Sequence, residues 1–361
     1  MKRIIKYTTL FIILLGLTTP LVATENDTTK IIQYSENELI AFLDSIGQLN
    51  PDACVEELSF KVNSNLYNQK TLNKELTTSD FEKLKKAVKD GFIDTAFALQ
   101  IFPELEFDTL LMVDENNSKL AIEFYSFDEK KEDFKEFAIL IGYGNGLFME
   151  SDVYFFHNKK IIAKHSIFYR YELELKHFKD ENNNTVIYYN VCYSSGTGIW
   201  WFQLNFYRYN NDQLQPVFTE IQNINLQFFT AFRVYNIQSE IVNERPLQLK
   251  FVYEDLFFSS YEEDRDLFVF PTISFIKDTT IVTYHIEKQS GKFIPDFSNS
   301  KLNRNKLLSY FLGYVENADS EIPFINAHYE LFKNGLSGND PILHDAILNY
   351  LNETKNVLEK R

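Results

Sequence analysis

The spacing of hydrophobic residues changes twice along the chain and divides it into three regions. From residue 24 to about 106, apolar residues recur at the three-to-four-residue interval of amphipathic helices. From about 107 to 298 they alternate with polar residues, which is typical of β-strands. From 299 to 361 the helical interval returns. This order predicts an α+β fold with N-terminal helices, a central, mostly antiparallel β region, and C-terminal helices packed on it.

Capping residues mark the expected helix starts. Ser35 and Glu38 have the spacing of a capping box ahead of a first helix. Ser79 and Glu82 predict the start of a second helix in the same way. Near the C-terminus, Pro341 fits the first position of a long amphipathic helix.

The central region is rich in β-branched and aromatic residues, which favour half-buried strand surfaces. Asn- and Asp-rich turns at 114–117, 180–183 and 210–212, and a Lys-Asp turn at 277–278, separate the expected strands. The candidate strands are 109–113, 119–125, 138–141, 152–156, 167–175, 185–193, 200–209, 247–253, 272–276 and 280–286.

Two segments of this region resemble each other and suggest an internal repeat. Residues 144–158 and 196–211 each contain a glycine-rich entry, an aromatic strand and a polar turn, about 52 positions apart. Such spacing fits propeller blades or stacked hairpins. The β body is therefore expected to be either a sandwich or a short propeller.

The first 23 residues have the pattern of a secretory signal peptide. Lys2, Arg3 and Lys6 form a cationic start, residues 10–17 are almost wholly apolar, and Leu21-Val22-Ala23 offers a cleavage site. The apolar run is short for a hydrocarbon core of about 30 Å. We expect cleavage, no membrane span afterwards, and a periplasmic or extracellular location, with an uncleaved anchor as the alternative.

The formal charge of −15 at pH 7 limits the partners that are expected. Such a field repels nucleic acids and anionic lipid surfaces, so nucleic-acid binding is not expected. A protein partner, cationic in particular, or a glycan is compatible with it. No cofactor is expected.

Cys54 and Cys192 are the two cysteines of the chain. In an oxidising compartment an even pair predicts a disulfide, and the alternative is two separate buried thiols. The six histidines have neither the helical nor the strand spacing of familiar zinc sites, so no metal site is expected. The loop at 180–191 begins like a calcium loop, but Thr185 replaces its glycine and Val191 its glutamate, which predicts a polar hairpin turn.

An acidic run supplies the only candidates for catalysis. Asp255, Glu262 and Asp264 are hypothetical catalytic carboxylates, since glycoside hydrolysis needs two of them about 5–9.5 Å apart. A charge run between aromatic strands is more typical of a solvated loop, which is the favoured interpretation.

Trp200, Trp201, Gly196 and Gly198 are the candidates for binding. Adjacent strand residues point to opposite faces, so one indole is exposed if the sheet has a wet face, and could stack on a sugar or anchor a partner. If both faces are covered, both indoles belong to the core. The two glycines fit either an anion-binding backbone nest or a bulge.

These features favour an exported, non-enzymatic binding or interaction protein of unknown partner. The alternative is an envelope or glycan hydrolase that uses carboxylates near Asp255 and Glu262 with Trp200 or Trp201 as a sugar platform. The choice between enzyme and binding protein stays open here, with binding favoured.

Overall fold

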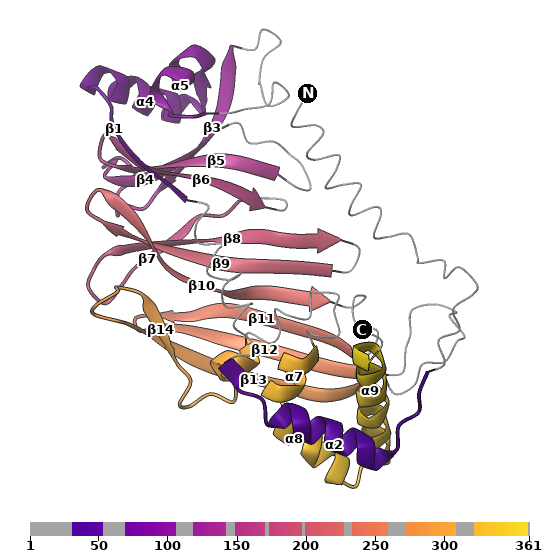
Figure 1. Cartoon of the computed structure of the whole chain (residues 1–361). Helices are drawn as coiled ribbons and strands as arrows, with labels where there is room; N and C mark the ends of the chain where they lie inside the picture. Colours follow the sequence, from indigo (N-terminus) through magenta and orange to yellow (C-terminus); the bar gives the residue numbers. More distant parts are fainter. Residues whose placement is uncertain are drawn as a thin grey trace, which may run out of the picture.

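The computed structural model has two antiparallel β-sheets, with helices from the N-terminal and C-terminal regions packed against them (Figure 1). The α+β prediction is therefore confirmed. The structure describes residues 31–52, 69–105, 118–141, 149–169, 173–196, 199–226, 233–258, 272–307 and 321–359.

The first sheet has six strands in the order β1-β6-β5-β4-β3-β2. Its central strands bury both faces, so they contain near-continuous runs of apolar residues such as Phe137–Ile141. The strand bounds are β1 (Gln69–Glu75), β2 (Phe92–Asp94), β3 (Lys119–Ser126), β4 (Glu136–Ile141), β5 (Met149–His157) and β6 (Lys160–Tyr169).

The second sheet has eight strands that follow the chain order from β7 to β14. One hydrophobic cluster receives side chains from all eight strands, so the sheet curls around it, and neither sheet closes on itself. The bounds are β7 (Lys176–Lys179), β8 (Thr185–Gly196), β9 (Ile199–Asn210), β10 (Gln213–Leu226), β11 (Arg233–Glu244), β12 (Leu247–Phe258), β13 (Thr272–Ile286) and β14 (Phe293–Asp296).

The two sheets pack face to face through a shared core between β4–β6 and β8–β9, which lie in adjacent layers in Figure 1. On β8, Ile187 and Tyr189 face this inter-sheet core, while Val186 and Tyr188 face the cluster inside the curled sheet. β8 is therefore covered on both faces over this stretch. The stacked-sheet arrangement corresponds to the sandwich alternative rather than the propeller.

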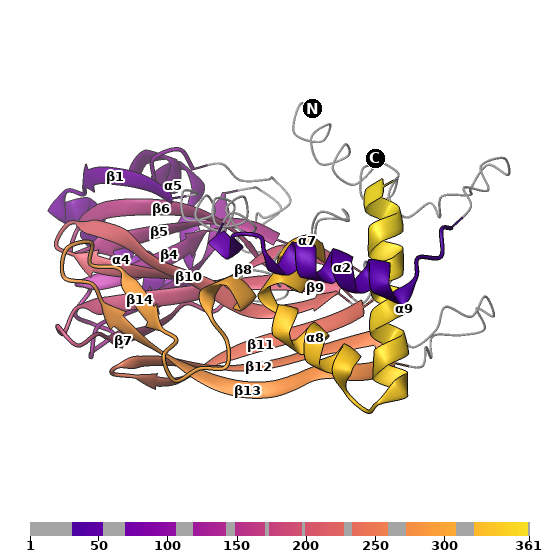
Figure 2. The same ribbon diagram turned by 60° about the horizontal axis from the view of Figure 1, so that its bottom comes forward.

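Helices cover the sheets at two separate places (Figures 1 and 2). The first pair packs on the six-stranded sheet, on the face opposite the second sheet. The other four form a layer at one end of β12 and β13, around Phe257 and Phe275. The bounds are α4 (Thr78–Asp90) and α5 (Thr95–Ile101) for the pair, and α2 (Glu36–Gly47), α7 (Glu321–Ala327), α8 (Tyr329–Ser337) and α9 (Pro341–Glu359) for the layer.

Hairpin turns follow the predicted asparagines. Asn158, Asn183 and Asn211 all have positive φ, the left-handed conformation that asparagine tolerates better than most residues. The 180–184 segment is the predicted polar turn, because the Asp180 side chain accepts the backbone N–H groups of Asn182 and Asn184 at 2.9 Å each. The two similar segments, 144–158 and 196–211, each lead into a hairpin turn, one in each sheet. The two turns lie close together, because Nδ1 of His157 is 2.8 Å from the carboxylate of Asp212.

Several predicted boundaries were wrong. The predicted helical region 24–106 also contains β1 and β2. The strand predicted at 167–175 is β6, which starts at Lys160 and ends at Tyr169. The predicted turn at 277–278 is absent from the described chain, because β13 runs unbroken from Thr272 to Ile286. There Lys277 reaches across to Glu254 on β12, with Nζ and Oε1 3.3 Å apart, and the paired neighbour keeps the backbone extended.

The second helix begins earlier than predicted. Its N-cap is Thr77, whose hydroxyl accepts the backbone N–H of Asp80 at 3.1 Å, whereas Ser79 and Glu82 lie within the helix. Gly91 ends it in the left-handed conformation, with φ of 75°. The Ser35 and Glu38 capping box of α2 is confirmed.

Replacing Thr77 with alanine is expected to lower the free energy of unfolding by about 1 kcal/mol, because a helix N–H loses its acceptor. Ser79→Ala is the matched control, and we expect it to change stability much less. Urea denaturation of both variants measures the difference. Equal losses in the two variants would contradict the assignment of Thr77 as the cap.

Candidate functional site

The candidate catalytic carboxylates are not assembled into a site by the described residues. Asp255 lies on β12, opposite Tyr235 and Ile276, and its exposed fraction is 0%. No substrate reaches that side chain in this conformation. Glu262 and Asp264 lie outside the described residues, so their role stays a prediction.

The two tryptophans are at the start of β9, as the strand prediction requires. Trp200 is opposite Ser195 on β8 and Asn225 on β10, and Trp201 is one position further along the strand. Gly196 is the last residue of β8. Gly198 lies outside the described residues. The binding roles of these four residues stay predictions.

Cys192 is buried on β8, with an exposed fraction of 2%. Cys54 lies outside the described residues, and the disulfide therefore stays a prediction. Among the described residues, no group of three or more histidine, cysteine, aspartate or glutamate side chains is arranged to hold a metal ion.

The eight-stranded sheet splits between β10 and β11. In the described chain these strands pair only where Asn223–Asn225 face Asn236–Gln238, whereas β11 pairs with β12 along nearly its full length. At the point of separation the Ser239 hydroxyl donates to the carbonyl of Ile221. This side-chain hydrogen bond joins β10 and β11 at a position where two paired strands would normally be joined by a backbone hydrogen bond.

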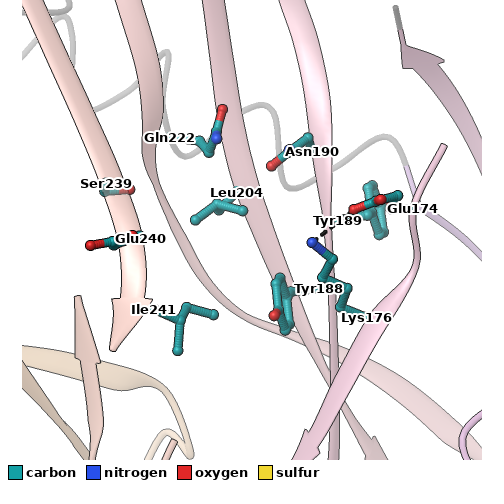
Figure 3. A pocket seen from close by; sticks show the side chains of 10 residues that line it. All are labelled: Glu174, Lys176, Tyr188, Tyr189, Asn190, Leu204, Gln222, Ser239, Glu240 and Ile241. Atoms are coloured by element: carbon teal, nitrogen blue, oxygen red, sulfur yellow. Dashed lines mark ion pairs between the residues drawn. The ribbon is translucent and has the colours of Figure 1, made fainter. Parts of the chain in front are cut away.

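A hollow of about 270 Å³ lies in this split, and we call it the split-sheet cleft. Figure 3 shows Ser239, Glu240 and Ile241 of β11 on one side and Glu174, Lys176 and Tyr188 on the other. Its full lining is Glu174, Lys176, Tyr188, Tyr189, Asn190, Leu204, Gln222, Ser239, Glu240 and Ile241. The volume is close to the lower end of the range of about 300–1,000 Å³ found for small-ligand sites.

A second lobe continues the cleft along β11. It shares Tyr188 and Ile241 with the first lobe, extends through residues 242–245, and holds about 510 Å³. Arg245 closes its far side, because its Nε donates to the carbonyl of Lys179 on β7. The cleft is thus bounded by β7 and β8 on one side and by one whole stretch of β11 on the other.

The charged groups of the cleft are exposed and paired. Glu174 forms an ion pair with Lys176 at 2.7 Å, and Glu240 forms one with Lys250 at 2.8 Å. Between them Tyr188 stacks on Phe206 with ring centroids 5.1 Å apart, and burial raises the pKa of its hydroxyl. The cleft therefore combines carboxylates, amides and an aromatic ring held against the core.

A buried carboxylate with a cationic partner lies on the strand next to Leu204 of the cleft lining. Glu220 on β10 lies opposite Leu204, is fully buried, and accepts a hydrogen bond from the Tyr284 hydroxyl at 3.0 Å. Arg304 reaches the same carboxylate at 3.1 Å from the segment that follows β14. Burial raises the pKa of Glu220, and the positive charge of Arg304 opposes that rise.

Comparison of the chain with protein-family models, with curated proteins and with solved structures finds no match in any of the three. Among the helices that the structure describes, none combines the length and apolar character that a membrane span requires.

None of the cleft residues was among the predicted sites. β10 and β11 were not predicted as strands, because Pro216 and several amides interrupt the apolar pattern of 213–226. The available signal was the alternation of Ile237, Ser239 and Ile241 with Gln238 and Glu240. It predicts a strand, but a split between two strands has no local sequence signature.

Proposed function

We propose that this chain is an exported, non-enzymatic binding protein whose ligand occupies the split-sheet cleft. The single observation that carries the proposal is the cleft, whose polar side chains come from β7, β8, β10 and β11 of one sheet and from Glu174 just before β7. Sites on strands hold their side chains more rigidly than sites on loops, so the ligand meets a preformed surface. Export is supported by the signal-peptide pattern of the first 23 residues.

The surroundings of the cleft carboxylates favour binding over catalysis. The side chains of Glu174 and Glu240 are 63% and 62% exposed, and each contacts a lysine. Such groups suit electrostatic contact with a ligand. In glycoside hydrolysis, by contrast, the general acid is a carboxyl group that burial keeps protonated near neutral pH.

Blocking the cleft is expected to weaken ligand capture without unfolding the protein. In the variant Asn190→Arg, a long cationic side chain enters the cleft from an exposed position on β8. The control is Thr279→Arg, at an exposed position on β13 that does not line the cleft. The tagged chain from residue 24 onward is used to capture components from envelope and culture fractions of its host, and retained material is quantified.

We expect the wild-type protein and Thr279→Arg to retain the same component, and Asn190→Arg to bind it roughly tenfold more weakly, a difference of about 1.4 kcal/mol. Equal retention by all three proteins would contradict the cleft as the binding site. Steady conversion of the captured component into a product would contradict the non-enzymatic role.

A further inference from the structure

We propose that the ligand of the split-sheet cleft is an extended, lysine- or arginine-bearing peptide segment of a partner protein, which adds as a strand to the edge of β11 at Ser239–Glu244. This inference rests on the proposed function, and it specifies the class of ligand and the way in which it is held.

The lining of the cleft shows that it follows an edge of β11. Successive side chains of a strand point to opposite faces of a sheet, so a hollow above one face is lined by every second residue. Here the two lobes together are lined by every residue from Ser239 to Arg245 in turn. The cleft therefore lies beside the backbone of β11.

Within the described ranges, no strand pairs with this edge of β11 beyond Gln238. β11 pairs with β12 on one side, and its pairing with β10 ends at Gln238 within the described chain. Alternate residues of an antiparallel strand direct N–H and C=O toward each neighbour, but the pairing of β11 with β12 shifts register between Ile241 and Asn243. About two or three residues of Ser239–Glu244 therefore present both groups to the cleft. Unpaired strand edges of this kind are templates for an added strand.

The side chains around the edge favour a cationic peptide. Of the three carboxylates that line the cleft, Glu174 and Glu240 are paired with Lys176 and Lys250, whereas Glu244 forms no ion pair among the described residues. The remaining cation of the lining, Arg245, donates to the Lys179 carbonyl, so Glu244 is the charged group left to contact a basic side chain of the ligand. The net charge of −15 adds a longer-range attraction for a basic segment.

Apolar contacts suit the alternate side chains of such a strand. Tyr188 and Ile241 line both lobes, and both pack against the core of the curled sheet. A strand that alternates basic and β-branched residues can direct one set toward these side chains and the other toward the glutamates. The six residues of Ser239–Glu244 span about 20 Å, so a peptide of about seven residues covers the edge.

The test uses a fluorescent seven-residue peptide that alternates lysine with valine and is blocked at both ends. Two further peptides are methylated on backbone nitrogens. One carries N-methyl groups on the backbone nitrogens of its lysine residues only, and the other carries them on the backbone nitrogens of its valine residues only. Because alternate N–H groups of a strand face opposite sides, only one methylated set removes the donors directed at β11. Fluorescence anisotropy measures affinity for the full chain, and hydrogen exchange measures protection of the Ser239–Glu244 amides.

We expect one methylated peptide to bind at least about tenfold more weakly and the other to bind like the parent. The parent peptide should also slow hydrogen exchange at Ser239–Glu244. Glu240→Lys should weaken binding, and Glu129→Lys, at an exposed turn away from the cleft, should not.

Equal loss or equal retention by the two methylated peptides, or no binding of the parent peptide, would overturn the inference. Sedimentation could instead show a concentration-dependent dimer in which a second copy of the chain occupies the cleft. That result would also overturn the inference of a peptide ligand from a partner protein. In a further outcome, the peptide does not bind while the wild-type protein retains a glycan that Asn190→Arg does not retain. In that case the proposed function stands, and only the assignment of a peptide ligand is contradicted.

Discussion

Replacing Arg304 with methionine is expected to lower the free energy of unfolding by roughly 3 kcal/mol at pH 7. The variant leaves the fully buried carboxylate of Glu220 without its cationic partner. We take the lower end of the usual range of about 3–5 kcal/mol, because the Arg304 side chain is itself 38% exposed and solvent screens part of its charge. Urea denaturation, followed by tryptophan fluorescence and far-ultraviolet circular dichroism, measures the loss.

The pH dependence of this loss identifies its cause. Burial raises the pKa of Glu220, and removal of Arg304 raises it further. A carboxyl group with a raised pKa in the folded state binds its proton more tightly there, so stability is gained as pH falls and is lost as pH rises through the folded pKa. The cost of Arg304→Met should therefore shrink from pH 8 to pH 5.

A double-mutant cycle provides the control. Glu220→Gln keeps the hydrogen bond from Tyr284 possible and removes the charge, so Arg304→Met should cost little in that background. A cost that is independent of pH and unchanged by Glu220→Gln would show that Arg304 acts through packing alone.

Lowering the pH from 6.5 to 4 is expected to remove about 3 kcal/mol of stability through His165 alone. This histidine lies on β6 in the inter-sheet core, between the rings of Phe155 and Tyr207, each with its centroid 4.5 Å away. Its Nδ1 lies 2.8 Å from the Tyr189 hydroxyl, and its Nε2 has no hydrogen-bond partner among the described residues. Burial lowers its pKa from 6.5 to about 3.

The direction of the effect follows from proton binding. Between pH 6.5 and about 3 the unfolded chain holds a proton on this residue that the folded chain does not. Stability therefore falls as pH falls, by about 1.4 kcal/mol per pH unit. From about one pH unit above 6.5 the residue is neutral in both states and contributes no pH dependence.

His165→Gln should remove this component from the stability–pH curve while it lowers the overall stability. The readout is the slope between pH 6.5 and 4, measured by urea denaturation at each pH. His285→Gln, at an exposed position on β13, is the control and should keep the wild-type slope. A His165→Gln protein with the same acid slope as the wild type would refute the assignment.

Local signals in the sequence predicted the elements whose structure depends on neighbouring residues. The capping box of Ser35 and Glu38 starts α2, and the asparagines at 158, 183 and 211 lie in hairpin turns. The cap of α4 was placed two residues too late, because Ser79 offers the same motif as Thr77. When two residues only two positions apart both suit a cap, the local pattern does not select between them.

The site depends on contacts between distant parts of the chain, which leave no direct signal in the local sequence. Asp255 is in a charge run that fits a solvated loop, yet its strand lies between β11 and β13 and its side chain is buried. The cleft arises because β10 follows β9 while β11 follows β12, so the two strands separate beyond Gln238. Strand patterns specify which face of a strand is buried, but not how far two strands stay paired.

The sequence by itself determined the α+β class, the helical and strand regions, the hairpin turns and the acidic charge, because periodicity, capping and turn chemistry act over a few residues. Only the tertiary structure placed α2 beside α9, where Asn352 and Asn356 bind the backbone of Tyr34 and Ile32. It also decided the stacking of the two sheets and the split that forms the cleft. These features depend on contacts between segments that are far apart in the sequence, up to 324 residues in the case of Ile32 and Asn356. No local pattern encodes such contacts.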